Sequence, residues 1–513
     1  MLIVNCKSIY VELWRMIMKK RVCFITPPSP FLLDERVFPS LGVLMVATVV
    51  KLSGRFTVSV LDLAGVSNFL EAVETYLATE SPMAIGLTVT TPQLPAAVKI
   101  IQIIRARAPS IRIILGGPHI TLTHTAHIRE QNAQNTCGRA TDALEKLLHL
   151  ADVLIAGDGE KAIFLALGDN PPKIINADNP KSDLFLTNQD LSGLPWPDRN
   201  LIDTKSYHYT IDGIPAMSLI SQLGCPFGCG FCGGRHSPSF RRMRSRTVSG
   251  IVAEMEHLYH SFGTRGFMFY DDELNVNQGL IAKLMTAIIN LQAKLGTEFR
   301  LRGFVKSQLF NDEQARLMYL AGFRVLLTGF ESGSPRMLAN INKQATVEEN
   351  TRCVEIAKAH NLKVKALMSL GHPGESRESA LATRDWLLAV KPDDFDLSVI
   401  TVYPGTPYYD EAVPHPSKPE VWVYGRNGDS LFSQNLDYSQ VSDFYKGDPN
   451  GGYASYVWSE YLTPQEIVEL RNEIEKDVRQ KLNIPYPGSA QAQRYEHSMG
   501  ASGLPSHILR SSS

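Results

Sequence analysis

Three cysteines within eight residues, Cys225, Cys229 and Cys232, are the side chains of this sequence whose type and spacing best suit chemistry. They lie in the segment Cys-Pro-Phe-Gly-Cys-Gly-Phe-Cys. An ordinary 4Fe-4S cluster takes four cysteine thiolates, so a loop that supplies three leaves one iron open. The spacing therefore predicts a cluster that can bind and activate another molecule at its open iron.

A structural zinc site is the alternative, because His236 lies four residues beyond Cys232 and three cysteines with one histidine can hold zinc. Zinc modules normally gather their ligands as two separated pairs, whereas these thiols share one short loop. The apolar run 216–220 before the loop predicts a buried strand, and 251–262 after it is helix-like. This order favours the cluster over zinc, and over three inert buried thiols.

The cysteine spacing, with Phe231 just before the third cysteine, resembles the signature of radical S-adenosylmethionine (SAM) enzymes. The resemblance implies that Cys225, Cys229 and Cys232 hold a 4Fe-4S cluster and that SAM binds its open iron. It also implies that the reduced cluster cleaves SAM into methionine and a 5'-deoxyadenosyl radical, which takes hydrogen from an unactivated carbon. An electron donor such as flavodoxin or ferredoxin is expected as a partner.

Strand and helix patterns alternate about six times after the linker, with strands predicted at 216–221, 266–271, 299–305, 324–330, 363–369 and 395–401. Thr346 and Glu349 form a capping-box pattern that predicts a helix start. Six such units predict a partial (β/α)6 barrel over 208–407, with its chemistry at the carboxyl ends of the strands.

Polar residues follow these predicted strands. Asp271, Asp272 and Glu273 end the second strand, and the resemblance implies that they contact the amino group of SAM. A solvated acidic turn is the alternative reading. Glu331, Ser332 and Gly333 end the fourth strand and resemble the family's nucleoside-binding turn. Arg302 and Lys306 on the third strand are candidates for the methionine carboxylate, although long basic side chains usually lie on the surface.

The N-terminal part alternates short apolar strands, at 22–26, 57–62, 84–89, 111–116 and 152–155, with helices near 41–52, 68–79 and 95–108. This pattern predicts a Rossmann-like parallel sheet covered by helices on both faces, with a ligand beyond the carboxyl ends of the strands. No G-x-G-x-x-G fingerprint follows the first strand, which weighs against a dinucleotide.

Four phrases of 21–168 together resemble the cobalamin-binding domain that precedes the radical domain in one large subfamily: Phe38 to Gly42, Thr88 to Thr91, Gly116 to His119 and Gly157 to Glu160. The resemblance implies cobalamin as a third cofactor. The candidate contacts are Leu41, Gly42, Asp62, Thr88, Thr91, Gly116, Gly117, His119, Gly157, Gly159 and Glu160.

The D-x-H-x-x-G motif that places a histidine under cobalt in many cobalamin proteins is absent. The radical subfamily commonly lacks it, so the resemblance implies a lower cobalt face without a protein ligand. His119 stands in a different context and is predicted to be a polar loop residue, directed at solvent, backbone or cofactor.

Five segments follow from these patterns. Residues 1–20 are predicted to be an N-terminal extension, 21–168 the cobalamin-binding domain and 169–207 a proline-rich linker. The barrel occupies 208–407, and 408–513 form a small C-terminal extension with one amphipathic helix at 463–482 and a disordered tail.

Composition agrees with a large enzyme of 513 residues with a net charge of -1, which gives no general field for nucleic acid. No apolar run reaches the ~18 residues of a membrane span, and no signal peptide is evident, so no membrane partner is expected. Cys6, Cys23, Cys137 and Cys353 are scattered, and seven cysteines do not suggest a disulfide framework. A reducing cytoplasm is the expected compartment.

The two resemblances together imply a cobalamin-dependent radical SAM methyltransferase. Its expected substrate is a small metabolite or natural-product precursor, methylated at an unactivated carbon or phosphorus. Rearrangement or cyclisation without methyl transfer stays open, because no residue separates the two. A methylthiotransferase would need a second three-cysteine cluster, and a non-catalytic cobalamin-binding or zinc-binding protein would form no reducible cluster.

Overall fold

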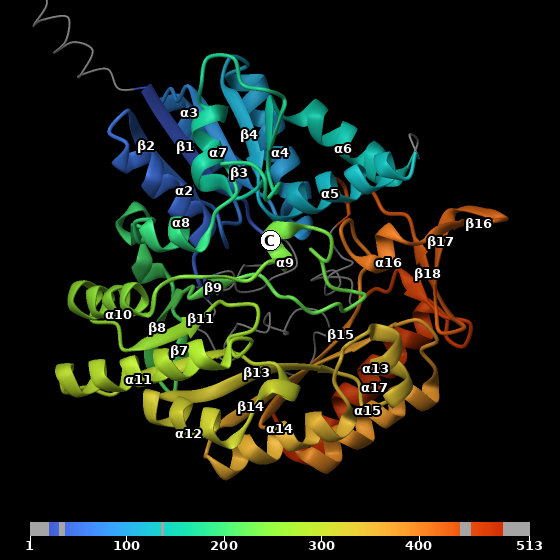
Figure 1. Ribbon diagram of the computed structural model, residues 1–513. Helices are drawn as coiled ribbons and strands as arrows, with labels where there is room; N and C mark the ends of the chain where they lie inside the picture. Colours follow the sequence, from blue (N-terminus) through green and yellow to red (C-terminus); the bar gives the residue numbers. More distant parts are fainter. Residues whose placement is uncertain (1–19, 30–35, 135–137, 442–452, 486–513) are drawn as a thin grey trace, which may run out of the picture.

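The computed structural model describes residues 20–29, 36–134, 138–441 and 453–485. The predicted N-terminal extension and the predicted disordered tail lie outside these residues, apart from Lys20. Two parallel sheets organise the molecule, the first in the upper half of Figure 1 and the second in the lower half.

The first sheet has six parallel strands in the order β2-β1-β3-β4-β5-β6. Its strands are β1 (Lys20–Thr26), β2 (Phe56–Asp62), β3 (Ala84–Thr88), β4 (Arg112–Gly116), β5 (Val153–Gly157) and β6 (Ile174–Ala177). The order reverses at β1, as in doubly wound folds, where ligands bind beyond the carboxyl ends of the strands.

Helices cover both faces of this sheet because each strand buries apolar side chains on both sides. One core contains residues of α2 (Leu41–Leu52) and α7 (Gly159–Ala166). The other contains residues of α3 (Phe69–Thr79), α4 (Leu94–Arg107), α5 (Pro118–Asn132) and α6 (Arg139–Leu150). The Rossmann-like architecture predicted from the sequence is confirmed.

The segment 169–207 is more structured than a linker. Strand β6 adds to the sheet beside β5, with Leu154 paired with Ile174 and Gly157 with Ala177. Helix α8 (Asn188–Gly193) follows and begins with a capping box between Thr187 and Asp190. The prediction missed β6 because a four-residue edge strand is too short to show a period.

The second sheet has seven strands in the order β15-β14-β13-β12-β11-β8-β7. Six are parallel and follow one another in the chain: β8 (Ile214–Leu219), β11 (Gly266–Phe269), β12 (Arg300–Phe304), β13 (Phe323–Glu331), β14 (Lys363–Leu370) and β15 (Asp394–Val399). The seventh, β7 (Thr210–Ile211), pairs antiparallel with β8. All six predicted strands are present, and the open order confirms a partial barrel.

Helices line the outer side of this second sheet (Figure 1). They are α10 (Val248–Phe262), α11 (Gln278–Leu295), α12 (Asp312–Ala321), α13 (Pro335–Ile341), α14 (Val347–Ala359) and α15 (Arg377–Val390). The predicted start of α14 is confirmed, since Thr346 accepts a hydrogen bond from Glu349 N and the Glu349 side chain reaches back to Thr346 N.

The C-terminal extension closes the edge of the barrel at β15. Helix α17 (Pro464–Leu482) places the buried guanidinium groups of Arg471 and Arg479 against that strand. Arg471 Nε donates to Leu397 O at 2.9 Å, and an Arg479 nitrogen donates to Phe395 O at 2.6 Å. Buried Glu475 lies between the two arginines. The helix thus satisfies carbonyl groups that an edge strand would otherwise expose.

A four-stranded antiparallel sheet in this extension was not predicted. Its strands are β16 (Val413–His415), β17 (Lys418–Arg426), β18 (Asp429–Gln434) and β19 (Val457–Trp458). Most of its residues are half-buried or exposed, so no strong apolar run marked these strands in the sequence.

Candidate active site between the two sheets

The cysteine loop is held by backbone hydrogen bonds to three other segments. Cys225 N donates at 2.8 Å to the carbonyl oxygen of Phe240, which lies in the short helix α9 (Pro238–Arg241). Gly230 N donates to Ile341 O at 2.7 Å, at the end of α13. Tyr408 N, at the start of α16 (Pro407–Asp410), donates to Gly230 O at 3.1 Å. These anchors fix the loop beyond the carboxyl end of β8.

The three thiols fit a cluster better than a single metal ion. All three are free cysteines, and burial raises the pKa of Cys232 to about 12, so a thiolate there needs a bound cation. Among the described residues, no three Cys, His, Asp or Glu side chains are placed to share one metal ion. Zinc requires convergence at about 2.3 Å, whereas the thiolates of a cluster bind different irons.

His236, the fourth ligand of the zinc alternative, turns to other partners. Its Nδ1 lies 2.9 Å from an Arg129 nitrogen of α5. Its Nε2 lies 3.8 Å from Glu411 and 4.0 Å from Asp410. The structure therefore gives no support to a site of three cysteines and His236.

The acidic trio after β11 divides into different roles. Buried Asp271 accepts hydrogen bonds from Ser221 N at 2.7 Å and Gln222 N at 3.1 Å, which fixes the chain entering the cysteine loop. Asp272 accepts from Gly224 N at 3.1 Å. In contrast, buried Oε2 of Glu273 has no hydrogen-bond partner among the described atoms.

Glu273 is consequently the member of the trio best placed for a ligand. Burial raises its pKa to about 7, and nearby Lys343 and Lys306 oppose that rise. An unpaired buried acceptor is costly unless something bonds to it. An amino group, such as that of SAM, would satisfy it.

Glu331 ends β13 in the left-handed region, with φ of +67°. Its carboxylate lies 3.0 Å from Lys343 Nζ and accepts from Ser369 Oγ at 2.8 Å. Such a backbone conformation costs a non-glycine residue about 1–3 kcal/mol and is kept where surrounding contacts determine it.

Ser332 and Gly333 pack on α15. Ser332 Oγ lies 3.0 Å from Thr383 Oγ1, and Gly333 N donates to the same atom at 3.0 Å. A Cβ at Gly333 would lie 2.5 Å from Ala382 O, so glycine permits this close approach. Their contact with SAM stays a prediction, because the amide groups of Ser332 and Gly333 already donate to Phe330 O and Thr383 Oγ1.

The two basic candidates on the third strand have protein partners. Arg302 donates to the hydroxyl of Tyr209. Lys306 Nζ donates to Lys343 O at 2.7 Å and lies 4.8 Å from the ring centre of Phe227. Lys306 thus supports the cysteine loop directly, and its role toward the methionine carboxylate stays a prediction.

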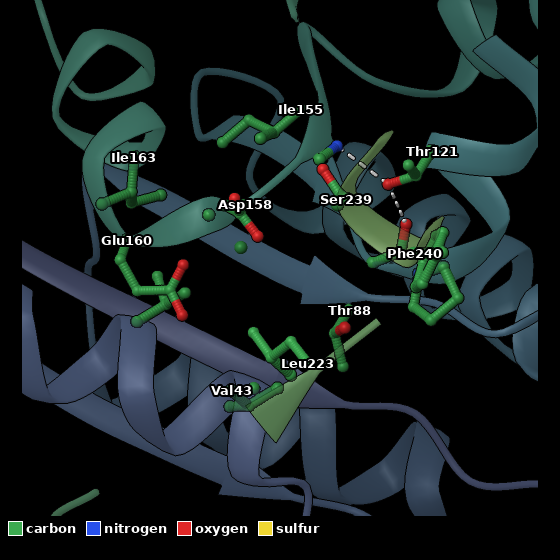
Figure 2. A pocket seen from close by; sticks show the side chains of 18 of the residues that line it. Val43, Thr88, Thr121, Ile155, Asp158, Glu160, Ile163, Leu223, Ser239 and Phe240 are labelled. Atoms are coloured by element: carbon green, nitrogen blue, oxygen red, sulfur yellow. Dashed lines mark hydrogen bonds between the residues drawn. The ribbon is translucent and has the colours of Figure 1, made fainter. Parts of the chain in front are cut away.

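A cavity of about 320 Å³ lies between the two sheets. Figure 2 shows Val43, Thr88, Ile155, Glu160 and Ile163 from the first sheet and its helices around the same space as Leu223, Ser239 and Phe240. Seven of the predicted cobalamin contacts line it: Gly42, Thr88, Gly116, Gly117, Gly157, Gly159 and Glu160.

Two glycines of this wall have backbone conformations that other residues rarely adopt. Gly117 has φ of +97°, and a Cβ there would lie 2.6 Å from Thr88 Oγ1. Gly157 has φ of +94°, and its Cβ would lie 2.3 Å from Asp178 N. Gly157 N donates to Thr121 Oγ1 at 2.9 Å. A wall of bare backbone leaves room for a flat macrocycle such as cobalamin.

The other four predicted contacts, Leu41, Asp62, Thr91 and His119, do not line this cavity. Asp62 is bound at 2.7 Å by both Arg36 and the Tyr207 hydroxyl. His119 lies in the first turn of α5, is buried, and its Nδ1 lies 3.0 Å from Thr91 Oγ1. The prediction that His119 is a loop residue is therefore wrong, because Pro118 begins a helix that the sequence reading missed.

The second domain supplies the rest of the cavity wall. Gln222, Leu223, Gly224, Tyr270 and Asp272 line it from the segments next to the cysteine loop. Ser239, Phe240 and Arg244 line it from the segment after that loop. Sequence reasoning did not predict these three residues, because it considered the ends of strands and not irregular segments. No described helix is long and apolar enough to cross a membrane.

Comparison with known proteins agrees with this arrangement. The B12 binding domain family matches residues 35–148, and the radical SAM superfamily matches residues 219–387. An uncharacterized methyltransferase of Pyrococcus horikoshii is 28% identical over 334 residues, which cover 65% of this chain and 70% of that protein.

Solved structures share the same architecture. The radical SAM methyltransferase TsrM of Kitasatospora setae, with tryptophan and a SAM analogue bound, has a TM-score of 0.65 at 18% identity and covers 92% of both chains. The cobalamin-dependent SAM radical enzyme OxsB has a TM-score of 0.55 at 15% identity, over 78% of this chain and 55% of that one.

The chain belongs to the radical SAM enzymes that carry a B12-binding domain. Its cofactors are a 4Fe-4S cluster, SAM and cobalamin.

Proposed function

We propose that this enzyme transfers a methyl group to an unactivated carbon or phosphorus of a small metabolite or natural-product precursor. One observation carries the proposal: a single cavity has the glycine wall of the B12-binding domain on one side and the entry to the cysteine loop on the other. Methyl transfer needs the two cofactor sites to face a shared space, and this cavity supplies it.

The cofactors supply the reaction chemistry, namely a radical from SAM at the reduced cluster and a methyl group carried by cobalamin. The residues of this chain bind and orient them. Cys225, Cys229 and Cys232 would hold the cluster, and Glu273 would accept a hydrogen bond from the SAM amino group. The glycines at the ends of β4 and β5 would lie under cobalamin.

The domain boundaries belong to the same proposal. We assign the cobalamin-binding unit to 21–177 rather than 21–168, because β6 completes its sheet. The barrel keeps its predicted bounds, 208–407, and α17 of the C-terminal extension acts as a cover for β15. A flavodoxin or ferredoxin is the proposed electron donor.

Cyclisation without methyl transfer is the second candidate. The anaerobic magnesium-protoporphyrin IX monomethyl ester cyclase of Rubrivivax gelatinosus is 23% identical over 355 residues, 66% of this chain and 60% of that protein. The two candidates differ in the product, since methyl transfer replaces one hydrogen of the substrate by a methyl group, a net gain of one CH2 in mass, and cyclisation adds no carbon. Mass spectrometry of the product separates them.

The first experiment is anaerobic purification and reconstitution with iron, sulfide and cobalamin, followed by electron paramagnetic resonance with and without SAM. We expect a reducible 4Fe-4S signal that changes when SAM is added and that Cys229→Ala abolishes. Cys353→Ala is the matched control, because Cys353 is a buried cysteine in α14. Retention of zinc instead of iron, or an intact cluster in Cys229→Ala, would sink the proposal.

A further inference from the structure

A network of hydrogen-bonded, buried polar side chains, which extends from Tyr408 to Lys343, lies behind the cysteine loop. The Tyr408 hydroxyl lies 3.2 Å from His372 Nδ1, and His372 Nε2 lies 2.8 Å from Ser369 Oγ. Ser369 Oγ lies 2.8 Å from Glu331, whose other oxygen lies 3.0 Å from Lys343 Nζ. All five side chains are buried.

The hydrogen-bond partners determine where the hydroxyl and imidazole protons of this network lie. Glu331 accepts hydrogen bonds from Lys343 Nζ and Ser369 Oγ, so the single hydroxyl proton of Ser369 points at Glu331. Ser369 can then only accept from His372, which requires a proton on Nε2. Burial lowers the pKa of His372 to about 3, so the ring is neutral and its Nδ1 accepts from Tyr408.

One end of this network contacts the backbone of the cysteine loop, and the other end is one residue away from a second contact. At one end, Tyr408 N donates to Gly230 O at 3.1 Å. At the other, Lys343 follows Asn342, whose amide donates to Gly228 O at 2.9 Å. The ring of His372 lies 5.5 Å from that of Phe231, between the second and third cysteines.

Within this network, Ser369 and Lys343 hold the side chain of Glu331, whose backbone is in the left-handed region with φ of +67°. Without Ser369 and Lys343, a strained glutamate at a strand end would relax, and the turn Glu331 to Gly333 would move with it. The hydrogen-bonded network therefore connects the turn that is predicted to face SAM with the loop that is predicted to hold the cluster.

We propose that His372, fixed with its proton on Nε2, is a positioning residue that couples the cysteine loop to the SAM-facing turn at Glu331. The inference rests on the proposed function, since it takes Glu331 to face SAM. His372 acts through Ser369 and Tyr408 and needs no contact with substrate.

The test compares His372→Leu with His372→Gln in the reconstituted protein. Glutamine can accept from Tyr408 and donate to Ser369, whereas leucine can do neither. The loss of two hydrogen bonds of ~1 kcal/mol each corresponds to a dissociation constant for SAM that is roughly 10- to 30-fold larger. We expect that loss in the leucine variant, a shifted electron paramagnetic resonance signal of its reduced cluster, and affinity within about threefold of wild type in the glutamine variant.

Iron content and thermal unfolding of the cofactor-free protein control for folding. If His372→Leu does not fold, Tyr408→Phe removes one hydrogen bond while keeping the ring, and its SAM affinity should fall by about threefold to tenfold. Wild-type affinity and spectrum in the leucine variant, or equal damage in both His372 variants, would overturn the inference. If the electron paramagnetic resonance signal of the wild-type cluster does not change when SAM is added, the proposed function is refuted, and the inference with it.

Discussion

Replacing Gly230 with alanine tests whether the cysteine loop is held as tightly as its contacts indicate. A Cβ at this position would lie 2.2 Å from Cε1 of Tyr408. Carbon atoms in contact are normally about 3.5–4.0 Å apart, so a displacement of more than about 1 Å is required. The backbone of Gly230 is not in the left-handed region, so the clash alone should decide the outcome.

Tyr408 cannot yield easily. Its side chain is fully buried, its hydroxyl contacts His372, and its ring centre lies 4.8 Å from that of Tyr424. The loop must therefore move, at an overpacking cost of about 1–3 kcal/mol. That range corresponds to roughly a 5- to 150-fold loss in the population of the correctly formed loop.

Iron and sulfide content after anaerobic reconstitution, together with thermal unfolding, measures this loss. Gly425→Ala is the control, because a Cβ there meets nothing within 4 Å. Adding Tyr408→Leu should restore part of the cluster content, since a smaller side chain relieves the clash. Wild-type iron content and unfolding temperature in Gly230→Ala would refute the reasoning.

Three further predictions concern cobalamin, the C-terminal helix and pH. Gly157→Ala should weaken cobalamin binding by about 5- to 150-fold in a spectrophotometric titration, because the overpacking cost is about 1–3 kcal/mol. Gly428→Ala, also at positive φ but with open space around it, should leave cobalamin binding unchanged. Glu475→Gln should lower the free energy of unfolding in urea by about 3–5 kcal/mol, because it breaks a buried ion pair. Glu473→Gln, at an exposed position, should cost no more than about 1 kcal/mol. Equal effects of the two variants would contradict a stabilising role for the buried ion pairs of Glu475 with Arg471 and Arg479. Burial lowers the pKa of His119 to about 4, so the folded chain binds fewer protons than the unfolded chain below pH 6.5. Stability from neutral His119 is therefore lost as pH falls, and between pH 7.5 and 5.5 wild type should lose about 1.3 kcal/mol relative to His119→Gln. If the difference in stability between wild type and His119→Gln does not change with pH, His119 is not the source of the loss.

The sequence predicted the elements that repeat a pattern and missed those that do not. Every predicted strand of both sheets is present, because buried parallel strands are continuous apolar runs. Strand β6 and the sheet β16 to β19 were missed, since short or half-exposed strands carry too few apolar residues to be distinctive. Helices α5 and α6 were also not predicted, although both are regular helices. Before α5, Gly116-Gly-Pro reads as a turn until the helix after it is known.

Within the candidate site, residue type indicated the chemistry but not the direction of each side chain. Three adjacent carboxylates looked equivalent in the sequence, yet Asp271 bonds to the backbone while Glu273 keeps an unpaired oxygen. Likewise, Thr88 and Thr91 lie in one phrase, but only Thr88 reaches the cavity. Such differences depend on contacts between segments distant in the chain, which no local pattern encodes.

Two aspartates at strand ends of the first sheet connect the cavity wall to the segment after the cysteine loop. Asp178, just after β6, accepts hydrogen bonds from Ser237 Oγ at 2.8 Å, Ser239 N at 2.7 Å and Thr125 Oγ1 at 3.0 Å. Asp158, just after β5, forms an ion pair with buried Arg244. The segment after the third cysteine is therefore fixed by the strand ends of the B12-binding domain. Because it also lines the shared cavity, a change that loosens it should disturb the cobalamin wall and the cysteine loop together.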